Sequence, residues 1–298
     1  MPENSTNVRI ASAVLAGLGT VSPRAAGRLA NELFCTTGPR RLTRFTPAPD
    51  AVEHFRAGRR QVVSYIWAGG GPTVLLVHGW RGRSGDMAHF IGPLRDAGRR
   101  VVVIDLPGHG RSPGGRSQLA DATLAVETVL RREPQIEAVI AHSFGVPATV
   151  LAAGRGAPVP RAVLLSGPAS MEPYLQRFAQ AFELSPTVRA AMRARLNRVL
   201  ERTGLKTTEL AAVAPALTGR ALIIHDREDR EVPFLSAQAL HRAWPGAELL
   251  PIEGFGHRRL LADPAIVERA VKFAVSWDRA AEQTTPPPAL RQLRVVAV

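Results

Sequence analysis

Two residue types are nearly missing from this chain of 298 residues, and the first is cysteine. Cys35 is the single one, so no disulfide can form within the chain. Cysteine scarcity suits the reducing conditions of the cytoplasm, and we therefore expect a cytoplasmic protein. No apolar run approaches the ~20 residues that a membrane-spanning helix requires. Residues 10–18 are apolar and follow Arg9, yet Glu3 and the lack of a small-residue cleavage site argue against a secretory signal.

The second scarce residue is lysine. Only Lys206 and Lys272 are lysines among the 38 basic residues, and all the others are arginine. This preference, together with abundant alanine, glycine and proline, is typical of a GC-rich bacterial genome. The net charge of +13 is spread along the chain without a run of five like charges. We therefore interpret the charge as a compositional feature and expect no nucleic-acid partner.

Motifs for metal and phosphate binding are also absent from the sequence. None of the eight histidines has the H-x-x-x-H or H-E-x-x-H spacing of a zinc site, and one cysteine offers no set of thiolates. No P-loop is present, and the three glycines at 69–71 precede a strand pattern, which favours an ordinary loop. We expect neither a metal nor another cofactor.

From residue 61 onward, short apolar segments alternate with longer amphipathic ones. Strands are predicted over residues 62–67, 73–77, 100–105, 138–142, 161–165, 221–225 and 247–252. Helices are predicted over residues 87–97, 117–131, 144–153, 235–243 and 264–277. Several strands are continuous apolar runs, as in parallel strands that are buried on both faces. The alternation predicts an α/β fold with a mostly parallel sheet and helices on both of its faces.

One interval, residues 169–215, interrupts this alternation because it contains helical patterns and no strand. One helix is expected to begin at Ser185-Pro186 and to end at Gly204. An all-helical insertion between two strands predicts a cap over a site. The other boundaries follow from it: a helical N-terminal extension over 1–59, a core over 60–168 and 216–278, and a polar tail over 279–298 that we expect to be disordered.

The N-terminal extension carries its helical pattern over residues 8–35, with an interruption at Ser22-Pro23. Two roles stay open for it. It packs against the core, or it forms a lid or an anchor that lies peripherally on a membrane surface. The second role rests on nearby basic residues, namely Arg24, Arg28, Arg40 and Arg41. The oligomeric state is not predicted by the sequence.

The most informative segment is residues 139–147. An apolar run leads into Ala141-His142-Ser143-Phe144-Gly145, and a helical pattern follows. This is the layout of a nucleophile elbow, a strained strand-to-helix turn that exposes a serine hydroxyl. The first glycine of G-x-S-x-G is replaced by Ala141, which adds only a methyl group. Ser143 is therefore the candidate nucleophile.

A serine hydroxyl needs a base to take its proton, and the base needs an orienting carboxylate. Open α/β sheets place such groups at the carboxyl ends of their strands. His257 follows the last predicted strand in a glycine-rich loop and is the candidate base. Asp226, Glu228 and Asp229 follow the strand before it, and we favour Asp229 as the acid.

The chain order Ser143, Asp229, His257 and four motifs together resemble the α/β-hydrolase superfamily over about residues 60–278. The motifs are LLVHGW at 75–80, VIDLPGHGRS at 103–112, DREDREVP at 226–233 and GH at 256–257. The resemblance implies a serine hydrolase of the esterase and lipase branch. It also implies an oxyanion hole formed by the backbone N–H groups of Trp80 and Phe144. In the implied mechanism, Ser143 attacks a carbonyl, His257 carries the proton and Asp229 orients the imidazole.

The remaining polar candidates are assigned from their positions. We expect His78 to shape the oxyanion loop by hydrogen bonding, and His109 to be structural. Asp105 is expected to bond neighbouring backbone N–H groups. His142 is expected to point away from the nucleophile and to line the substrate pocket, whereas His225 should be buried and hydrogen-bonded.

The substrate is expected to be a small acyl or ester compound whose acyl or alkyl part is hydrophobic. Phe178 and Phe182 of the cap are the candidate pocket residues. Arginines of the predicted cap could also attract an anionic group of the substrate. These arginines are Arg189, Arg193, Arg195, Arg198 and Arg202.

Three functions are compatible with these residues. The favoured one is hydrolysis of a carboxylic ester or thioester through an acyl-enzyme. The second is acyl transfer or cofactor-free perhydrolysis with the same triad, in which another nucleophile outcompetes water. The third is a non-catalytic binding protein on a hydrolase scaffold.

Overall fold

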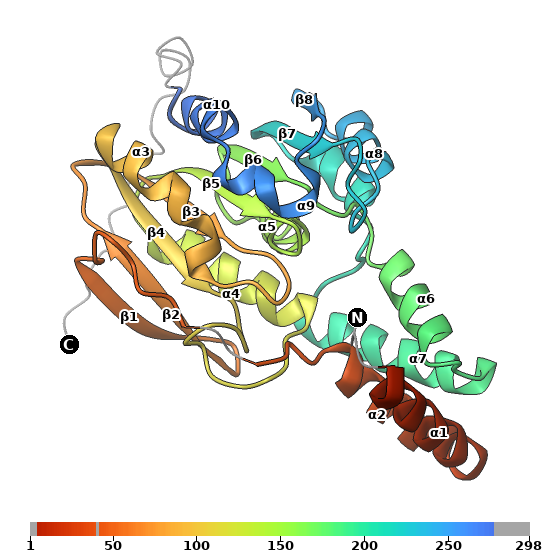
Figure 1. Cartoon of the computed structure of the whole chain (residues 1–298). Helices are drawn as coiled ribbons and strands as arrows, with labels where there is room; N and C mark the ends of the chain where they lie inside the picture. The colour runs from red at the N-terminus through yellow and green to blue at the C-terminus, as the bar shows by residue number, and fades with distance from the viewer. Residues whose placement is uncertain (1–4, 40–41, 277–298) are drawn as a thin grey trace, which may run out of the picture.

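The computed structural model describes residues 5–39 and 42–276, which form one sheet with helices on both faces (Figure 1). Its eight strands lie in the order β1-β2-β4-β3-β5-β6-β7-β8. Strands β3 to β8 are parallel, whereas β2 is antiparallel to both of its neighbours. The strands are β1 (Ala51–Ala57), β2 (Arg60–Trp67), β3 (Gly71–Val77), β4 (Arg99–Asp105), β5 (Ile136–His142), β6 (Arg161–Leu165), β7 (Arg220–Asp226) and β8 (Ala247–Ile252). The predicted tail over 279–298, and Arg40 and Arg41, lie outside the described residues.

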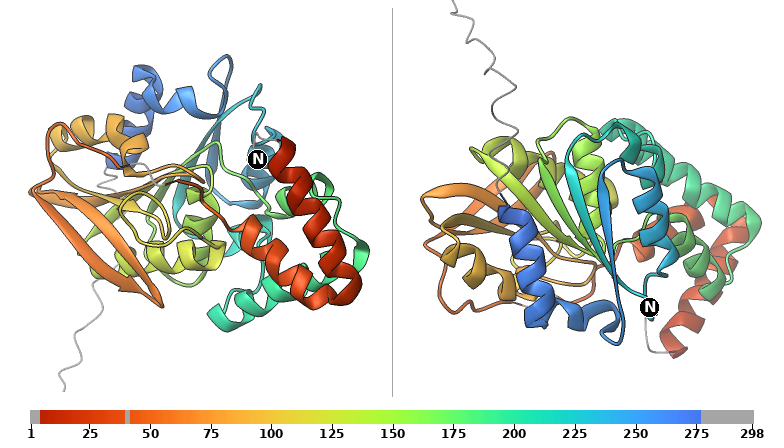
Figure 2. Two further views of the ribbon diagram at one scale, coloured as in Figure 1. Left: turned by 60° about the horizontal axis from the view of Figure 1, so that its bottom comes forward. Right: turned by 90° about the horizontal axis from the view of Figure 1, so that it is seen from above.

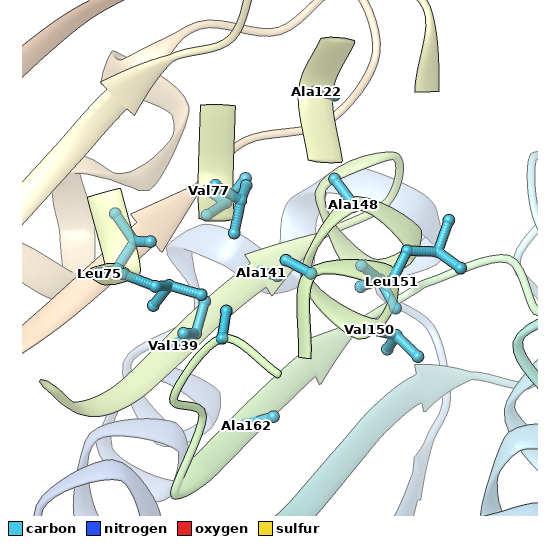
Figure 3. Packing of buried hydrophobic residues seen from close by; sticks show 14 of the residues in the cluster. Leu75, Val77, Ala122, Val139, Ala141, Ala148, Val150, Leu151 and Ala162 are labelled. Atoms are coloured by element: carbon cyan, nitrogen blue, oxygen red, sulfur yellow. The ribbon is translucent and has the colours of Figure 1, made fainter. Parts of the chain in front are cut away.

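The central strands divide their side chains between two apolar cores because successive residues of a strand point to opposite faces. Leu75 and Val77 of β3 belong to one core, and Val74 and Leu76 belong to the other. Every residue of β5 is buried. Figure 3 shows the first core, in which residues of β3 and β5 pack beside α5. Burial on both faces explains why these strands are continuous apolar runs in the sequence.

Helices cover both faces of the sheet (Figure 2). The helices of the first core are α4 (Leu119–Arg132), α5 (Gly145–Gly154) and α8 (Leu235–Ala243). The second core is covered by the 3-10 helix η1 (Ser84–Phe90), α3 (Ile91–Asp96) and α10 (Pro264–Val275). The short helix α9 (Gly256–Arg259) follows β8 and contains His257.

Four further helices pack together beside the sheet, and we call them the four-helix unit (Figures 1 and 2). They are α1 (Ser5–Val21), α2 (Pro23–Phe34), α6 (Glu172–Ala181) and α7 (Pro186–Thr203). Their shared apolar cluster includes Leu15, Phe178 and Met192. Helices α2 and α7 cross so closely that a Cβ at Gly27 would lie 2.7 Å from the Cβ of Ala191. The N-terminal helices are therefore joined to the helices of the predicted cap.

The structure corrects the expected helical extension over residues 1–59. Its helices end at Phe34, and residues 51–57 form strand β1, which pairs with β2 through a tight turn at Gly58. This edge strand is largely exposed and contributes main-chain hydrogen bonds more than apolar side chains. It therefore lacks the apolar pattern that revealed the other strands. The helix predicted over 87–97 is also divided, into η1 and α3.

Candidate active site

Ser143 occupies a sharp turn between β5, which ends at His142, and α5, which begins at Gly145. Its φ is +50°, a left-handed conformation that residues with a side chain seldom adopt. A Cβ at Gly145 would lie 2.8 Å from the carbonyl oxygens of Val77 and His78, so glycine permits the close approach of helix and strand. The backbone thus has the strained strand-to-helix geometry that the sequence pattern predicts.

Three side chains from separate loops form a continuous hydrogen-bonded row. The Nε2 atom of His257 lies 2.9 Å from the Oγ atom of Ser143, and its Nδ1 atom lies 2.8 Å from the Oδ2 atom of Asp229. Both His257 and Asp229 are buried. Since a serine hydroxyl donates to the unprotonated nitrogen of an imidazole, this row can carry the serine proton to Nε2.

Asp229 is oriented by its own loop. Its Oδ1 atom accepts hydrogen bonds from the backbone N–H groups of Glu231 (2.8 Å) and Val232 (2.9 Å). Burial by itself raises the pKa of Asp229, but the hydrogen bonds from His257 and from these two backbone groups outweigh burial and lower that pKa below its ordinary value. The carboxylate therefore stays ionised and faces the imidazole.

The structure separates the two neighbouring acid candidates from this role. Asp226 is buried, and its Oδ2 atom accepts from the backbone N–H groups of Phe255 (2.5 Å) and Gly256 (2.8 Å). It therefore fastens the loop that carries His257. Glu228 is exposed on the surface. Of the three candidates, Asp229 is thus the carboxylate that hydrogen-bonds to the ring of His257, and the sequence analysis favoured it.

His142 packs against His257 and forms a hydrogen bond with its backbone. It is buried, its Nε2 atom donates to the carbonyl oxygen of His257 at 2.9 Å, and the two ring centroids are 4.9 Å apart. Burial first, and then the neighbouring ring of His257, lower the pKa of His142 to about 3, so the ring of His142 is neutral at physiological pH. That His142 lines the substrate pocket stays a prediction, and the structure adds this hydrogen bond to the loop of His257. No sequence pattern signals such a contact, because it joins residues 115 positions apart.

The loop that carries Trp80 lies directly against Ser143. A Cβ at Gly79 would lie 2.8 Å from the Cβ atom and 3.3 Å from the Oγ atom of Ser143. The rings of Trp80 and Phe144 pack edge to face, with centroids 5.1 Å apart. The structure therefore brings both predicted oxyanion residues beside the candidate nucleophile.

Two buried histidines hold this loop. His78 donates from Nδ1 to the carbonyl oxygen of Gly79 (2.7 Å) and accepts at Nε2 from the backbone N–H of Leu106 (3.0 Å). His109 accepts at Nε2 from the backbone N–H of Arg81 (3.2 Å). Burial lowers the pKa of both rings, that of His109 to about 3. As expected, His78 shapes the loop by hydrogen bonding and His109 is structural.

Two further expectations about buried polar residues are confirmed. Asp105 accepts hydrogen bonds from the backbone N–H groups of Ser84 and Arg111, each at 2.8 Å. His225 is buried and donates from Nε2 to the carbonyl oxygen of Val232 at 2.9 Å. Both residues stabilise loops around the row of three side chains.

The structure corrects the expectation that Phe178 and Phe182 line the substrate pocket. They are only 6% and 5% exposed, and they lie in the apolar cluster of the four-helix unit. The ring of Phe178 packs edge to face against Phe34 of α2, with centroids 5.4 Å apart. The N-terminal helices cover the apolar face of α6 that the sequence left without a partner. The two rings therefore join α6 and the residues after it to these helices.

The part of the predicted cap that contacts the loop of Asp229 is a polar edge of α6. The hydroxyl of Tyr174 and the guanidinium of Arg177 donate to the carbonyl oxygen of Glu231, at 3.4 and 3.3 Å. The side chain of Glu231 points toward the site, with an Oε2 atom 3.8 Å from the Nε2 atom of His257. Sequence reasoning missed all three residues. Tyr174 and Arg177 belong to no motif, and Glu231 occupies a variable position within the motif at 226–233.

Two curated proteins are similar in sequence to part of this chain. The pimeloyl-[acyl-carrier protein] methyl ester esterase of Methylococcus capsulatus is 37% identical over 129 residues, which are 39% of this chain and 48% of that protein. The dihydrolipoyllysine-residue acetyltransferase component of the acetoin cleaving system of Cupriavidus necator is 40% identical over 114 residues, 34% of this chain and 29% of that protein. The chain thus spans less than half the length of either relative.

The fold also has close counterparts among solved structures. The esterase Pf2001 of Pyrococcus furiosus is similar with a TM-score of 0.61 at 17% sequence identity, over 80% of this chain and 96% of that one. A family model described as the alpha/beta hydrolase family matches residues 74–270, which is more than half of the chain. With the elbow, the parallel sheet and the loop order in agreement, the chain belongs to the alpha/beta hydrolase family.

Proposed function

We propose that this protein is a serine hydrolase that cleaves a carboxylic ester or thioester through an acyl-enzyme on Ser143. The observation that carries the proposal is the hydrogen-bonded row from Ser143 through His257 to Asp229, placed at a strained elbow. Such a row is the arrangement that activates a serine hydroxyl. The name of the Methylococcus relative, a methyl ester esterase, supports an ester substrate.

In the proposed reaction, the Oγ atom of Ser143 attacks the substrate carbonyl while Nε2 of His257 takes its proton. The resulting imidazolium is stabilised by the ionised Asp229. It then gives the proton to the departing oxygen or sulfur, which leaves as an alcohol or thiol. A water molecule attacks the acyl-enzyme in the reverse sequence, so that a carboxylic acid is released and the Ser143 hydroxyl is restored.

Negative charge develops on the substrate carbonyl oxygen during the attack, and hydrogen-bond donors are needed to stabilise it. We propose that the backbone N–H groups of Trp80 and Phe144 supply them, with help from the positive N-terminal end of α5. In comparable enzymes one such donor contributes about 2.7–4 kcal/mol to transition-state stabilisation. The close approach of Gly79 to Ser143 supports this assignment, because it brings the loop that carries Trp80 against the nucleophile.

Acyl transfer with the same triad is the second candidate. The name of the Cupriavidus relative, an acetyltransferase component, is the observation that favours it. A binding protein without catalysis is the third, and the intact row of three side chains argues against it. The acid product and the transfer product differ chemically, so product analysis separates the first two candidates.

The first test is hydrolysis of p-nitrophenyl esters from acetate to palmitate by the wild type and by Ser143→Ala. We expect the activity to vanish in the variant, and the chain-length optimum gives the size of the acyl pocket. The matched control is Ser166→Ala, because Ser166 also has a positive φ (+48°) at a strand end and its buried hydroxyl has no hydrogen-bond partner in the described structure. Activity that survives in Ser143→Ala contradicts the proposal.

We also propose that α1 rests on the surface of an anionic membrane. Among the described residues, no helix is both long and apolar enough to span a bilayer. The outer face of α1 nevertheless exposes Ile10 (59%), Val14 (50%) and Val21 (85%). Exposed arginines at positions 24 and 28 follow on α2, and neither forms an ion pair in the described structure, so their charge is available to anionic headgroups.

Co-sedimentation with vesicles tests this second proposal. Binding is expected with phosphatidylglycerol vesicles, weaker binding with phosphatidylcholine alone, and loss of binding in Val14→Asp. Ala16→Asp serves as the matched control on an exposed position of the same helix. Equal sedimentation of wild type and Val14→Asp contradicts a membrane role, as does concentration-dependent dimerisation that Val14→Asp abolishes.

A further inference from the structure

The carboxylate of Glu231 lies beside the row of three side chains, and the proposed triad mechanism does not use it. Its Oε2 atom lies 3.8 Å from the Nε2 atom of His257, the nitrogen that faces Ser143. This distance is too long for a direct hydrogen bond. The side chain is half exposed, so solvent reaches the space beside it. Glu231 therefore lies beside the position that the second nucleophile must occupy to transfer its proton to Nε2 of His257.

Several contacts hold this carboxylate in position. Arg258 donates to both of its oxygens, from Nε to Oε1 at 3.2 Å and from Nη2 to Oε2 at 3.3 Å. The backbone of Glu231 is fixed at both ends, since its N–H donates to Asp229 and its carbonyl oxygen accepts from α6 of the cap. A carboxylate oxygen has two lone pairs, so Oε2 keeps one acceptor site beside its bond to Arg258.

The two acceptors, Nε2 of His257 and Oε2 of Glu231, match the two O–H bonds of water. One water molecule with hydrogen bonds of about 2.8 Å to each can bridge atoms 3.8 Å apart. Its lone pairs are then free to face the carbonyl carbon of the acyl group on Ser143. An alcohol has a single O–H bond, which Nε2 requires, and so it gains nothing from Glu231.

We propose that Glu231 is a positioning residue that selects water as the second nucleophile and thereby makes the protein a hydrolase rather than an acyltransferase. The inference rests on the proposed acyl-enzyme on Ser143. In the step, the water oxygen forms a bond to the acyl carbon and the ester bond to Ser143 breaks. One water proton passes through Nε2 to Ser143, and the other stays in the hydrogen bond to Glu231 until the carboxylic acid leaves.

The test separates formation of the acyl-enzyme from its hydrolysis. We compare the wild type with Glu231→Met, which keeps the length of the side chain and removes the acceptor. In rapid-mixing experiments with p-nitrophenyl butyrate, Glu231→Met is expected to keep the rate of the p-nitrophenol burst within about twofold and to lower the subsequent steady rate about tenfold, as for loss of one hydrogen bond to the reacting water. Glu231→Gln keeps an acceptor and is expected to fall between the two.

Competition with methanol gives an independent readout. Because methanolysis does not use Glu231, the ratio of methyl butyrate to butyric acid is expected to rise about tenfold in Glu231→Met. The control is Glu253→Met, which removes another exposed carboxylate of the loop before His257, one paired with Arg227 at 3.3 Å. This control should change neither the rates nor the product ratio.

Two outcomes overturn the proposal. In the first, Glu231→Met changes burst and steady rates by the same factor and leaves the methanol ratio unchanged, which indicates a role in holding His257. In the second, it changes neither rate. Failure of the underlying function looks different, because a wild type without an acyl-enzyme gives no burst and no labelling of Ser143 by a fluorophosphonate.

Discussion

The sheet core and the four-helix unit differ in how they are built and in what they carry. The core buries large aliphatic side chains on both faces of the sheet, whereas the four-helix unit encloses one small cluster in which helices approach through glycine and alanine. All five buried histidines of the described structure belong to the core. The candidate reactive groups thus lie on loops at the ends of rigid strands, and the four-helix unit supplies none of them.

The largest expected effect is on activity, and it distinguishes two neighbouring aspartates of the sheet core, Asp229 and Asp226. Asp229→Asn should keep the fold and lower kcat about 10⁴-fold, because the amide no longer stabilises the imidazolium or its tautomer. Asp226→Asn should mainly lower the stability of the loop that it fastens, since it leaves backbone N–H groups without a charged acceptor. Ester kinetics and thermal unfolding of both variants measure the contrast. Equal activity of Asp229→Asn and the wild type would assign the acid role elsewhere.

The second-largest effect is expected at low pH, which should destabilise the sheet core more than the four-helix unit. The pKa values of His109 and His142 are lowered to about 3, by burial first and by a neighbouring histidine second. The unfolded chain binds these protons near pH ~6.5 and the folded chain does not, so stability falls as the pH decreases from about 6.5 toward 3. The sequence of the four-helix unit contains no histidine.

Peptide-resolved hydrogen exchange between pH 7 and pH 3.5 tests this difference. Peptides from β5 are expected to lose protection before peptides from α2 and α7. His142→Gln removes one of the shifted groups, so its acid midpoint should lie at a lower pH than that of the wild type. Loss of protection in α2 and α7 ahead of β5 would reverse the comparison.

The smallest effect concerns the crossing of α2 and α7. Gly27→Ala places a Cβ 2.7 Å from both the Cβ atom of Ala191 and the backbone nitrogen of Met192, and overpacking of this kind costs about 1–3 kcal/mol. Gly17→Ala is the matched control, because the space around Gly17 is open and alanine favours a helix by about 1 kcal/mol. Limited proteolysis should detect loosening of the four-helix unit in Gly27→Ala alone. Identical cleavage of the two variants would contradict the close crossing.

The contrast between the sheet core and the four-helix unit also explains which predictions from the sequence succeeded and which failed. The strands of the core were predicted because burial on both faces leaves continuous apolar runs, and Ser143 and Asp229 were found because loops after such strands have fixed places. Phe178 was misassigned because an apolar helical face does not reveal its partner, here helices more than 140 positions earlier in the chain. Glu231 was missed as a site residue, and the hydrogen bond of His142 to His257 was not foreseen, because both depend on distances between loops.

The joining of α2 to α7 has a consequence for biosynthesis. Residues 23–34 leave the ribosome long before residues 186–203, and the strands β1 to β6 are made in between. At about 5–20 residues per second, the delay is on the order of ten seconds or more. During that interval the nascent N-terminal helices expose Leu15 and Ala26, whose covering surface does not yet exist. Chaperones that recognise apolar helices should therefore engage this chain early and release it only after α7 has emerged.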